Sequence, residues 1–247
     1  MIGGGSGVRV DADAVGDDTT PAVERAPDRA RATRRALLRA AADQFYAAGY
    51  HGASLSEIVA AAGVTKGALY FHFPGKHALA EAVAADVNAT WTAVVAEVTG
   101  RGLDPLDTLV AESDEAVAHL LGDPIVRGGT RLLHDPLLRS LRTADLAGRQ
   151  YGYAESAIAT HLATAAQAGL LRPGLDATWR AQLAQSIVAT ITGHHVICDL
   201  TDADAALWDR VTAMWQALLP MIATDAWLER WRRSDWPHRP RPHSTPT

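Results

Sequence analysis

The stretch GYHGASLSEIVAAAGVTKGALYFHFPGKHALAEAV, residues 49–83, contains two short amphipathic segments separated by a glycine. Ser54 precedes the first segment, and Glu57 three residues later completes a capping-box pattern for a helix N-terminus. Gly63 ends this segment, and Thr65 is a suitable cap for a second, very short helix. Two short helices joined by a glycine-containing turn predict a helix-turn-helix.

Small, cationic and aromatic residues alternate in the second segment. The second helix of a helix-turn-helix enters the major groove, so its first residues must be small or polar, as Thr65, Lys66 and Gly67 are. Gly67 lacks a Cβ and would allow close approach to DNA. The donors expected to reach phosphates are Tyr70, His72 and Lys76. The alternative reading is a short amphipathic helix with ordinary surface lysines.

Charge is distributed unevenly along the chain. The 247 residues carry a formal net charge of −5. Residues 29–80 hold seven basic and two acidic residues, a net of +5, whereas residues 1–28 hold two basic and six acidic residues, a net of −4. A compact positive block on an acidic protein indicates a localised anionic partner. The predicted helix-turn-helix lies inside that block.

Composition narrows the class of protein further. Hydrophobic residues make up 48% of the chain, and none of its apolar runs reaches the roughly 18 residues of a membrane span. The first residues lack the order of a signal peptide, so a cytoplasmic location is expected. Cys198 is the single cysteine, which excludes intramolecular disulfides and cysteine-based zinc sites. We expect no cofactor and no metal.

The periodicity predicts an all-α fold, because apolar residues recur every three or four positions almost to Trp231. The expected domains are a disordered leader (1–28), a three-helix DNA-binding domain (29–76), a larger helical domain (77–231), for which the family resemblance described below implies ligand binding and dimerisation, and a flexible tail (232–247). The expected longer helices cover residues 31–48, 77–99, 104–121, 124–134, 153–168, 176–199 and 202–230.

Residues 31–85 resemble the DNA-binding region of TetR-type repressors. The diagnostic positions filled are Gly49, Ser54, Ile58, Ala62, Gly63, Val64, Thr65, Gly67, Leu69, Tyr70, His72, Phe73 and Lys76. The segment TKGALYFHFPGKHALAEAV, together with VRGGTRLL at 126–133, is similar in sequence to receptors for γ-butyrolactone, butenolide and furan signalling molecules that control antibiotic production. The resemblance implies DNA-facing roles for Ser54, Thr65, Lys66, Gly67, Tyr70, His72 and Lys76. Arg34 and Arg35 lie where relatives often touch phosphate, or are simply solvated.

The resemblance also implies that the middle helices enclose a ligand site, whose walls should be apolar with a few hydrogen-bond donors. The candidate residues are Trp91, Thr130, Arg131, Tyr151, Tyr153, Gln182 and Ser186. The alternative role for Arg131 is an internal salt bridge with Asp86 or Glu115. The alternative role for Trp91 is packing in the core. Receptors of this branch generally have a pocket tryptophan after the middle helices, whereas residues 100–178 contain none. This difference predicts either a ligand of another shape or a receptor that no longer binds the usual lactone.

The last two expected helices carry wide apolar stripes, formed by Leu183, Ile187, Ile191, Val196 or Cys198 and by Leu207, Val211, Met214, Trp215, Leu218 and Met221. Such stripes fit either a monomer core or a subunit interface. In TetR relatives the equivalent helices form a four-helix interface, so the resemblance favours a homodimer.

The expected function is ligand-responsive transcriptional repression, with release from a pseudo-palindromic operator when a small signalling molecule binds. An enzyme is not expected, because the adjacent His194 and His195 point about 100° apart on a helix and cannot chelate one ion together. The alternatives within the same fold are a repressor that answers a drug or metabolite, and a pseudo-receptor without such a ligand.

Overall fold

The computed structural model describes residues 22–135, 143–234, 236 and 239. Within them the chain is all-α, as predicted, with one isolated β-bridge between Leu171 and Ala223. The helices are α1 (Ala22–Gly52), α2 (Leu55–Ala61), α3 (Lys66–His72), α4 (Lys76–Thr99), α5 (Pro105–Gly122), α6 (Pro124–His134), α7 (Thr143–Gln167), α8 (Ala177–Leu200), the 3-10 helix η2 (Asp204–Ala206), α9 (Leu207–Ile222) and α10 (Asp225–Arg233). None of the helices in these residues is long and apolar enough to cross a bilayer.

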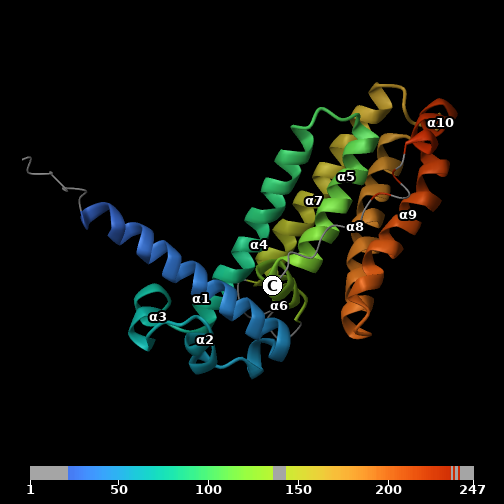
Figure 1. Ribbon diagram of the computed structural model, residues 1–247. Helices are drawn as coiled ribbons and strands as arrows, with labels where there is room; N and C mark the ends of the chain where they lie inside the picture. The colour runs from blue at the N-terminus through green and yellow to red at the C-terminus, as the bar shows by residue number, and fades with distance from the viewer. Residues whose placement is uncertain (1–21, 136–142, 235, 237–238, 240–247) are drawn as a thin grey trace, which may run out of the picture.

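Helices α1 to α3 form the N-terminal lobe, with α4 leading away from it into the larger bundle (Figure 1). Both predicted helix caps are present: the hydroxyl of Ser54 accepts from the Ser56 N–H at 3.3 Å, and that of Thr65 from the Ala68 N–H at 3.2 Å. Gly63 has a φ of 64°, a left-handed conformation that favours glycine and ends α2. The lobe's own core contains Leu38, Phe45, Ile58, Leu69 and Phe73.

Helix α1 is longer than the sequence pattern suggested. It begins at Ala22, so residues 22–28 are helical although we expected them in a disordered leader; residues 1–21 lie outside the described part. Alanine has the highest helix propensity, and Asp28 pairs with Arg31 one turn later at 3.0 Å, which supports the helical turn. At the other end Gly49 interrupts the helix with a φ of 67°.

The larger bundle consists of α4, α5 and α7 to α10, whose long helices run side by side (Figure 1). Its core contains Leu109, Leu162, Ile187 and Trp215, among others. Helix α7 begins at Thr143, ten residues before the expected start at 153. The expected helix over 202–230 is divided into η2, α9 and α10.

The break between α9 and α10 has a clear cause in the segment after α7. The backbone N–H of Arg172 donates to the Ile222 carbonyl at 2.8 Å, and that of Thr224 donates to the Leu170 carbonyl at 2.9 Å. This pairing satisfies backbone groups that a continuous helix would have used itself. Periodicity within residues 202–230 carries no information about this distant partner.

Helix α6 packs between the two lobes at close range. A Cβ on Gly128 would lie 2.1 Å from the carbonyl oxygen of Ala42 in α1, and one on Gly129 would lie 2.3 Å from Val87 Cγ2 in α4. Only glycines permit these approaches, so the Gly128-Gly129 pair lets α6 contact α1 and α4 almost backbone to backbone. The lobes are therefore connected through α6 as well as through α4.

The C-terminal segment, expected to be a flexible tail from residue 232, begins inside α10, which ends at Arg233, and Trp236 and Arg239 farther along also contact the bundle. Trp236 Nε1 donates to Asp114 Oδ2 at 3.1 Å, and the Arg239 guanidinium also binds the Asp114 carboxylate. Arg239 lies 3.6 Å from the Trp236 ring and 4.1 Å from the Trp208 ring. A half-buried acidic partner on α5 thus holds these residues against the bundle.

Candidate DNA-binding face and effector cavity

Helix α3 presents polar and aromatic side chains to solvent at the tip of the N-terminal lobe. Lys66 and Tyr70 are exposed, and Phe71 is 80% exposed, the largest value among the described large hydrophobic residues. A Cβ on Gly67 would meet only Thr65 Oγ1, at an ordinary 3.8 Å. Packing within the chain therefore does not require glycine at position 67, and the close approach of DNA stays a prediction.

Three other predicted DNA-facing residues have contacts within the chain. The Lys76 ammonium donates to the Ala53 carbonyl at 2.9 Å and to the His51 carbonyl at 3.2 Å, and it lies 4.8 Å from the Tyr50 ring. Lys76 therefore connects the start of α4 to the end of α1, and its phosphate contact stays a prediction. The His72 ring lies edge-on to Phe71, and the Arg34 guanidinium lies 5.4 Å from the Phe73 ring.

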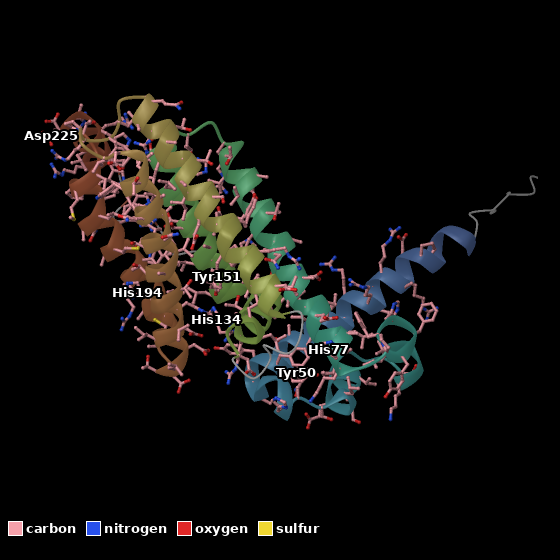
Figure 2. The ribbon with its side chains drawn as sticks, turned by 180° about the vertical axis from the view of Figure 1, so that it is seen from behind. Tyr50, His77, His134, Tyr151, His194 and Asp225 are labelled. Carbon is pink, nitrogen blue, oxygen red and sulfur yellow. The ribbon has the colours of Figure 1, made fainter. Side chains whose placement is uncertain are left out.

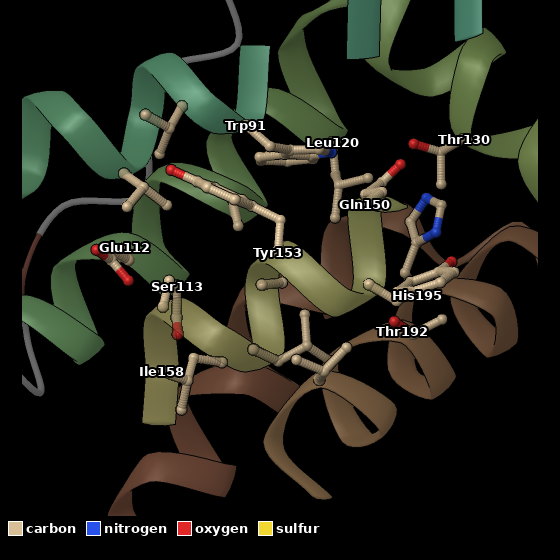
Figure 3. A pocket seen from close by; sticks show the side chains of 18 of the residues that line it. Trp91, Glu112, Ser113, Leu120, Thr130, Gln150, Tyr153, Ile158, Thr192 and His195 are labelled. Carbon is tan, nitrogen blue, oxygen red and sulfur yellow. The ribbon is translucent and has the colours of Figure 1, made fainter. Parts of the chain in front are cut away.

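A cavity of about 150 Å³ lies within the larger bundle, between α4, α5, α6, α7, α8 and α9. Figure 3 shows Glu112 and Ser113 toward one end, Thr130, Thr192 and His195 toward the other, and Trp91 and Gln150 between them. Its apolar walls include Val94, Leu109, Leu120, Ile158, Val188 and Ile191. An apolar cavity with a few convergent polar groups is the usual form of a small-molecule site.

The structure brings some of the predicted ligand-site residues together and separates others. Trp91, Thr130, Tyr151 and Tyr153 line the cavity. The other three predicted residues do not line it: Arg131, Gln182 and Ser186 are exposed.

Helix geometry explains why these three residues do not line the cavity. Arg131 follows Thr130 by one position, about 100° around α6, and its guanidinium instead lies 5.9 Å from the Tyr46 ring of α1. Glu115, its suggested salt-bridge partner, pairs with Arg101 at 2.5 Å. Gln182 and Ser186 lie on the outer face of α8, whereas Val188, Thr192 and His195 of the same helix face the cavity.

Two histidines in the cavity wall were not predicted. His134 Nε2 contacts the Tyr151 hydroxyl, and its ring lies 6.1 Å from that of His195; Figure 2 shows His134 and Tyr151 close to one another near the junction with the N-terminal lobe. Burial lowers the pKa of His134 to about 4, with a smaller contribution from His195, and burial also lowers the pKa of His195. Both imidazoles are therefore neutral near pH 7 and supply one donor and one acceptor each.

A buried acidic residue also lines the cavity. Glu112 of α5 accepts a hydrogen bond from His161 of α7, with Nε2 and Oε1 2.9 Å apart. Glu112 is the one charged residue among the buried residues of α5, a signal that could have marked it in the sequence. Trp215 of α9 adds a second indole beside that of Trp91, so the cavity has tryptophans although residues 100–178 have none.

A polar cluster links the N-terminal lobe to the rest of the chain. Tyr46 of α1 donates to Asp204 Oδ2 at 3.2 Å, and Arg127 of α6 lies 4.0 Å from the Tyr46 ring. Arg127 also pairs with Asp204 at 3.5 Å. The cluster joins α1, α6 and η2, while Thr130 and His134, farther along α6, reach the cavity.

The apolar stripes predicted for a subunit interface lie mainly in the chain's own core. Ile187, Val211 and Trp215 are buried there, and Leu183 and Leu218 pack against the same core. The large apolar side chains left exposed on α8 and α9 are Ile197 (46%), Leu200 (76%) and Met221 (68%). Of these only Met221 belongs to a predicted stripe, so an interface on the outer face of these helices would use only part of the stripes.

A small helix-turn-helix lobe joined to a helical bundle with an internal cavity is the architecture of a ligand-responsive transcriptional regulator. The family model for "Bacterial regulatory proteins, tetR family" matches residues 37–83. TylP, a TetR regulator from Streptomyces fradiae, is 32% identical; the matched region covers 83% of this chain and 85% of that one, with a TM-score of 0.60. The chain belongs to the TetR family.

Two other relatives are named as receptors. The A-factor receptor protein of Streptomyces griseus is 35% identical over 196 residues, which are 79% of this chain and 65% of that protein, slightly less than two thirds of its length. A crystallised γ-butyrolactone receptor, an ArpA-like protein, is 28% identical with a TM-score of 0.67, covering 82% of this chain and 94% of that one. The relatives are regulators of transcription or receptors of signalling molecules.

Proposed function

We propose that this chain is a TetR-type repressor that binds a pseudo-palindromic operator as a homodimer and leaves it when a small signalling molecule enters the cavity. The observation that supports this most directly is the combination, in one chain, of an exposed α3 and an internal cavity, with α6 in contact with both lobes. We assign no catalytic role to the chain and propose that it acts in the cytoplasm.

On DNA, the first turn of α3 would face the base edges, with Thr65, Lys66 and Gly67 nearest to them. Phosphate contacts would come from Arg34, Tyr70, His72 and Lys76, with Ser54 at the start of α2. Two recognition helices about 34 Å apart in a dimer match successive major grooves.

Release from DNA requires the ligand to bind one conformation of the dimer better than another, because only differential affinity shifts an equilibrium. Helix α6 carries Thr130 and His134 into the cavity and Gly128 onto α1. Since Gly128 touches the Ala42 backbone, a displacement of α6 by ligand must move α1 with it or separate the two helices. Helix α4 provides a second connection, from Trp91 to the N-terminal lobe.

The test is a gel shift with the promoters beside the chain's own gene, with and without a culture extract from the producing bacterium. We expect a shifted band that the extract abolishes. Lys66→Ala should reduce discrimination between operator variants by about 1–3 kcal/mol if the ammonium reaches a guanine edge. The matched control is Arg149→Ala, an exposed cation remote from α3, which should leave discrimination unchanged.

The outcomes separate the candidate functions. A shifted band that persists with the extract but disappears with another metabolite identifies a repressor with a different effector. A shifted band that persists with every compound identifies a pseudo-receptor. Absence of any sequence-specific band would contradict the proposal itself.

A further inference from the structure

The cavity wall contains buried polar atoms that have no hydrogen-bond partner among the residues that the structure describes. Four such atoms belong to residues of the cavity wall: Trp91 Nε1, Thr130 Oγ1, Gln150 Oε1 and Trp215 Nε1. Buried polar groups are almost always hydrogen-bonded, since each unsatisfied one costs about 1–3 kcal/mol. Four of them around one apolar cavity indicate a ligand that completes their hydrogen bonds.

The chemistry of these atoms restricts the ligand. An indole N–H only donates, so Trp91 and Trp215 both require acceptor atoms on the ligand. The amide oxygen of Gln150 only accepts and requires a donor, while the Thr130 hydroxyl serves in either role. A ligand that satisfies all four carries at least one hydrogen-bond donor in addition to its acceptors.

The charge in the wall restricts the ligand further. Glu112 is buried at one end of the cavity, where its carboxylate, hydrogen-bonded to His161, leaves no free donor for an anion and disfavours a second carboxylate. At the other end the geometry holds His134 against the Tyr151 hydroxyl and beside His195, whose imidazoles are neutral near pH 7 because of burial. A carboxylate has no donor for Gln150 and would lose its hydration on entry.

Resting on the proposed function, we propose that the effector is an uncharged, mainly apolar molecule that accepts hydrogen bonds from the indoles of Trp91 and Trp215 and donates one to Gln150. The site therefore discriminates against carboxylic acids of the same shape. A neighbouring surface hollow shares Trp91 and Gln150 with the cavity and contains the exposed Arg149. Arg149 therefore serves as the control for an anion that binds in this hollow rather than in the cavity.

The test uses three probes that share one skeleton: an alkylfuran carboxylic acid, its primary amide and its methyl ester. Only the amide carries a donor, and only the acid is charged at pH 7.5. Titration calorimetry should show the amide binding about tenfold more tightly than the ester, which lacks the partner for Gln150. The acid should be the weakest of the three by at least about tenfold relative to the amide.

Variants assign the effect to named atoms. Gln150→Leu should remove the advantage of amide over ester, and Trp91→Phe should weaken both about equally, because both present a carbonyl oxygen. Gln182→Leu, on the exposed face of α8, should change neither. Thermal melts establish that each variant is folded, and the two cavity variants test the proposal independently of one another.

Opposite results overturn it. Three results would each contradict the inference: tightest binding by the acid, a loss of acid affinity in the Arg149→Gln variant, or no binding of any of the three probes. These results are distinct from failure of the proposed function, which is measured without any probe as loss of the sequence-specific operator band.

Discussion

Lys76 is the residue at which the family pattern and the structure suggest different roles. Its position predicts a phosphate contact, whereas its ammonium donates to the carbonyls of His51 and Ala53. A hydrogen bond from a charged group contributes about 1.5–3 kcal/mol, and of the two bonds only the one to Ala53 is partly buried. The two roles are compatible only if the remaining N–H reaches DNA.

Lys76→Met separates these roles, because it keeps the side-chain stem and removes the donors. We expect the free energy of unfolding to fall by about 2 kcal/mol, measured by urea denaturation. Lys66→Met, at an exposed position, should change it by less than about 0.5 kcal/mol. If Lys76→Met instead leaves the free energy of unfolding unchanged and only reduces the salt dependence of DNA binding by the amount expected for one phosphate contact, the residue acts on DNA alone.

His134 predicts how stability responds to pH. Burial lowers its pKa in the folded state to about 4, below the ordinary 6.5, so its contribution is fully present above pH 6.5 and is lost as pH falls toward 4. The loss should approach about 2–3 kcal/mol. Asp107, whose pKa is raised to about 6 by burial and by Asp104, acts in the opposite sense over much of this window.

The difference between the wild-type protein and a His134→Phe variant therefore isolates the histidine. Unfolding free energies measured from pH 7.5 to 4 should converge as the pH falls, because phenylalanine has no proton to bind. Parallel curves would show that His134 titrates normally in the folded protein.

At the scale of elements, α6 is the helix on which the connection between lobes depends. Gly128→Ala would place a Cβ 2.1 Å from the Ala42 carbonyl oxygen, and a backbone atom cannot yield without separating α1 from α6. Overpacking of this kind costs about 1–3 kcal/mol. We expect a lower midpoint of thermal unfolding together with a changed operator affinity.

The matched control is Gly148→Ala in α7, where a Cβ meets nothing within 4 Å. Alanine has the higher helix propensity, so this variant should be stabilised by up to about 1 kcal/mol. A Gly128→Ala variant as stable as wild type, with unchanged operator affinity, would mean that α6 does not set the position of α1.

At the scale of the whole molecule, the outer face of α8 and α9 is the surface on which a homodimer would form. Leu200 is its most exposed apolar side chain, at 76%. Leu200→Asp should produce a monomer in light scattering at micromolar concentration and weaken operator binding, because a charge buried in an interface without a partner is strongly unfavourable.

Leu103→Asp provides the comparison, since Leu103 is 43% exposed in the segment between α4 and α5, away from that face. It should leave the oligomeric state unchanged. A wild-type monomer, or a dimer that survives Leu200→Asp, would place the interface elsewhere.

The sequence by itself determined the all-α fold and the local design of the N-terminal lobe. Capping side chains, Gly63 and the three- to four-residue apolar spacing act within one or two turns, so Ser54, Thr65 and the bounds of α6 could be predicted from neighbouring residues alone. The cavity candidates Trp91, Thr130, Tyr151 and Tyr153, all of which line the cavity, came instead from the family resemblance and from the donors that a ligand site needs.

Only the tertiary structure decided which helix faces meet. It turned Arg131 toward Tyr46 rather than the cavity, brought Glu112, His134 and Gln150 together from three helices, and placed Ile187 and Trp215 in the core rather than at an interface. It also divided the last expected helix through hydrogen bonds from a segment some fifty residues away, between Leu170 and Thr224. Periodicity reports that a helix has an apolar face, but packing against distant elements determines what that face contacts.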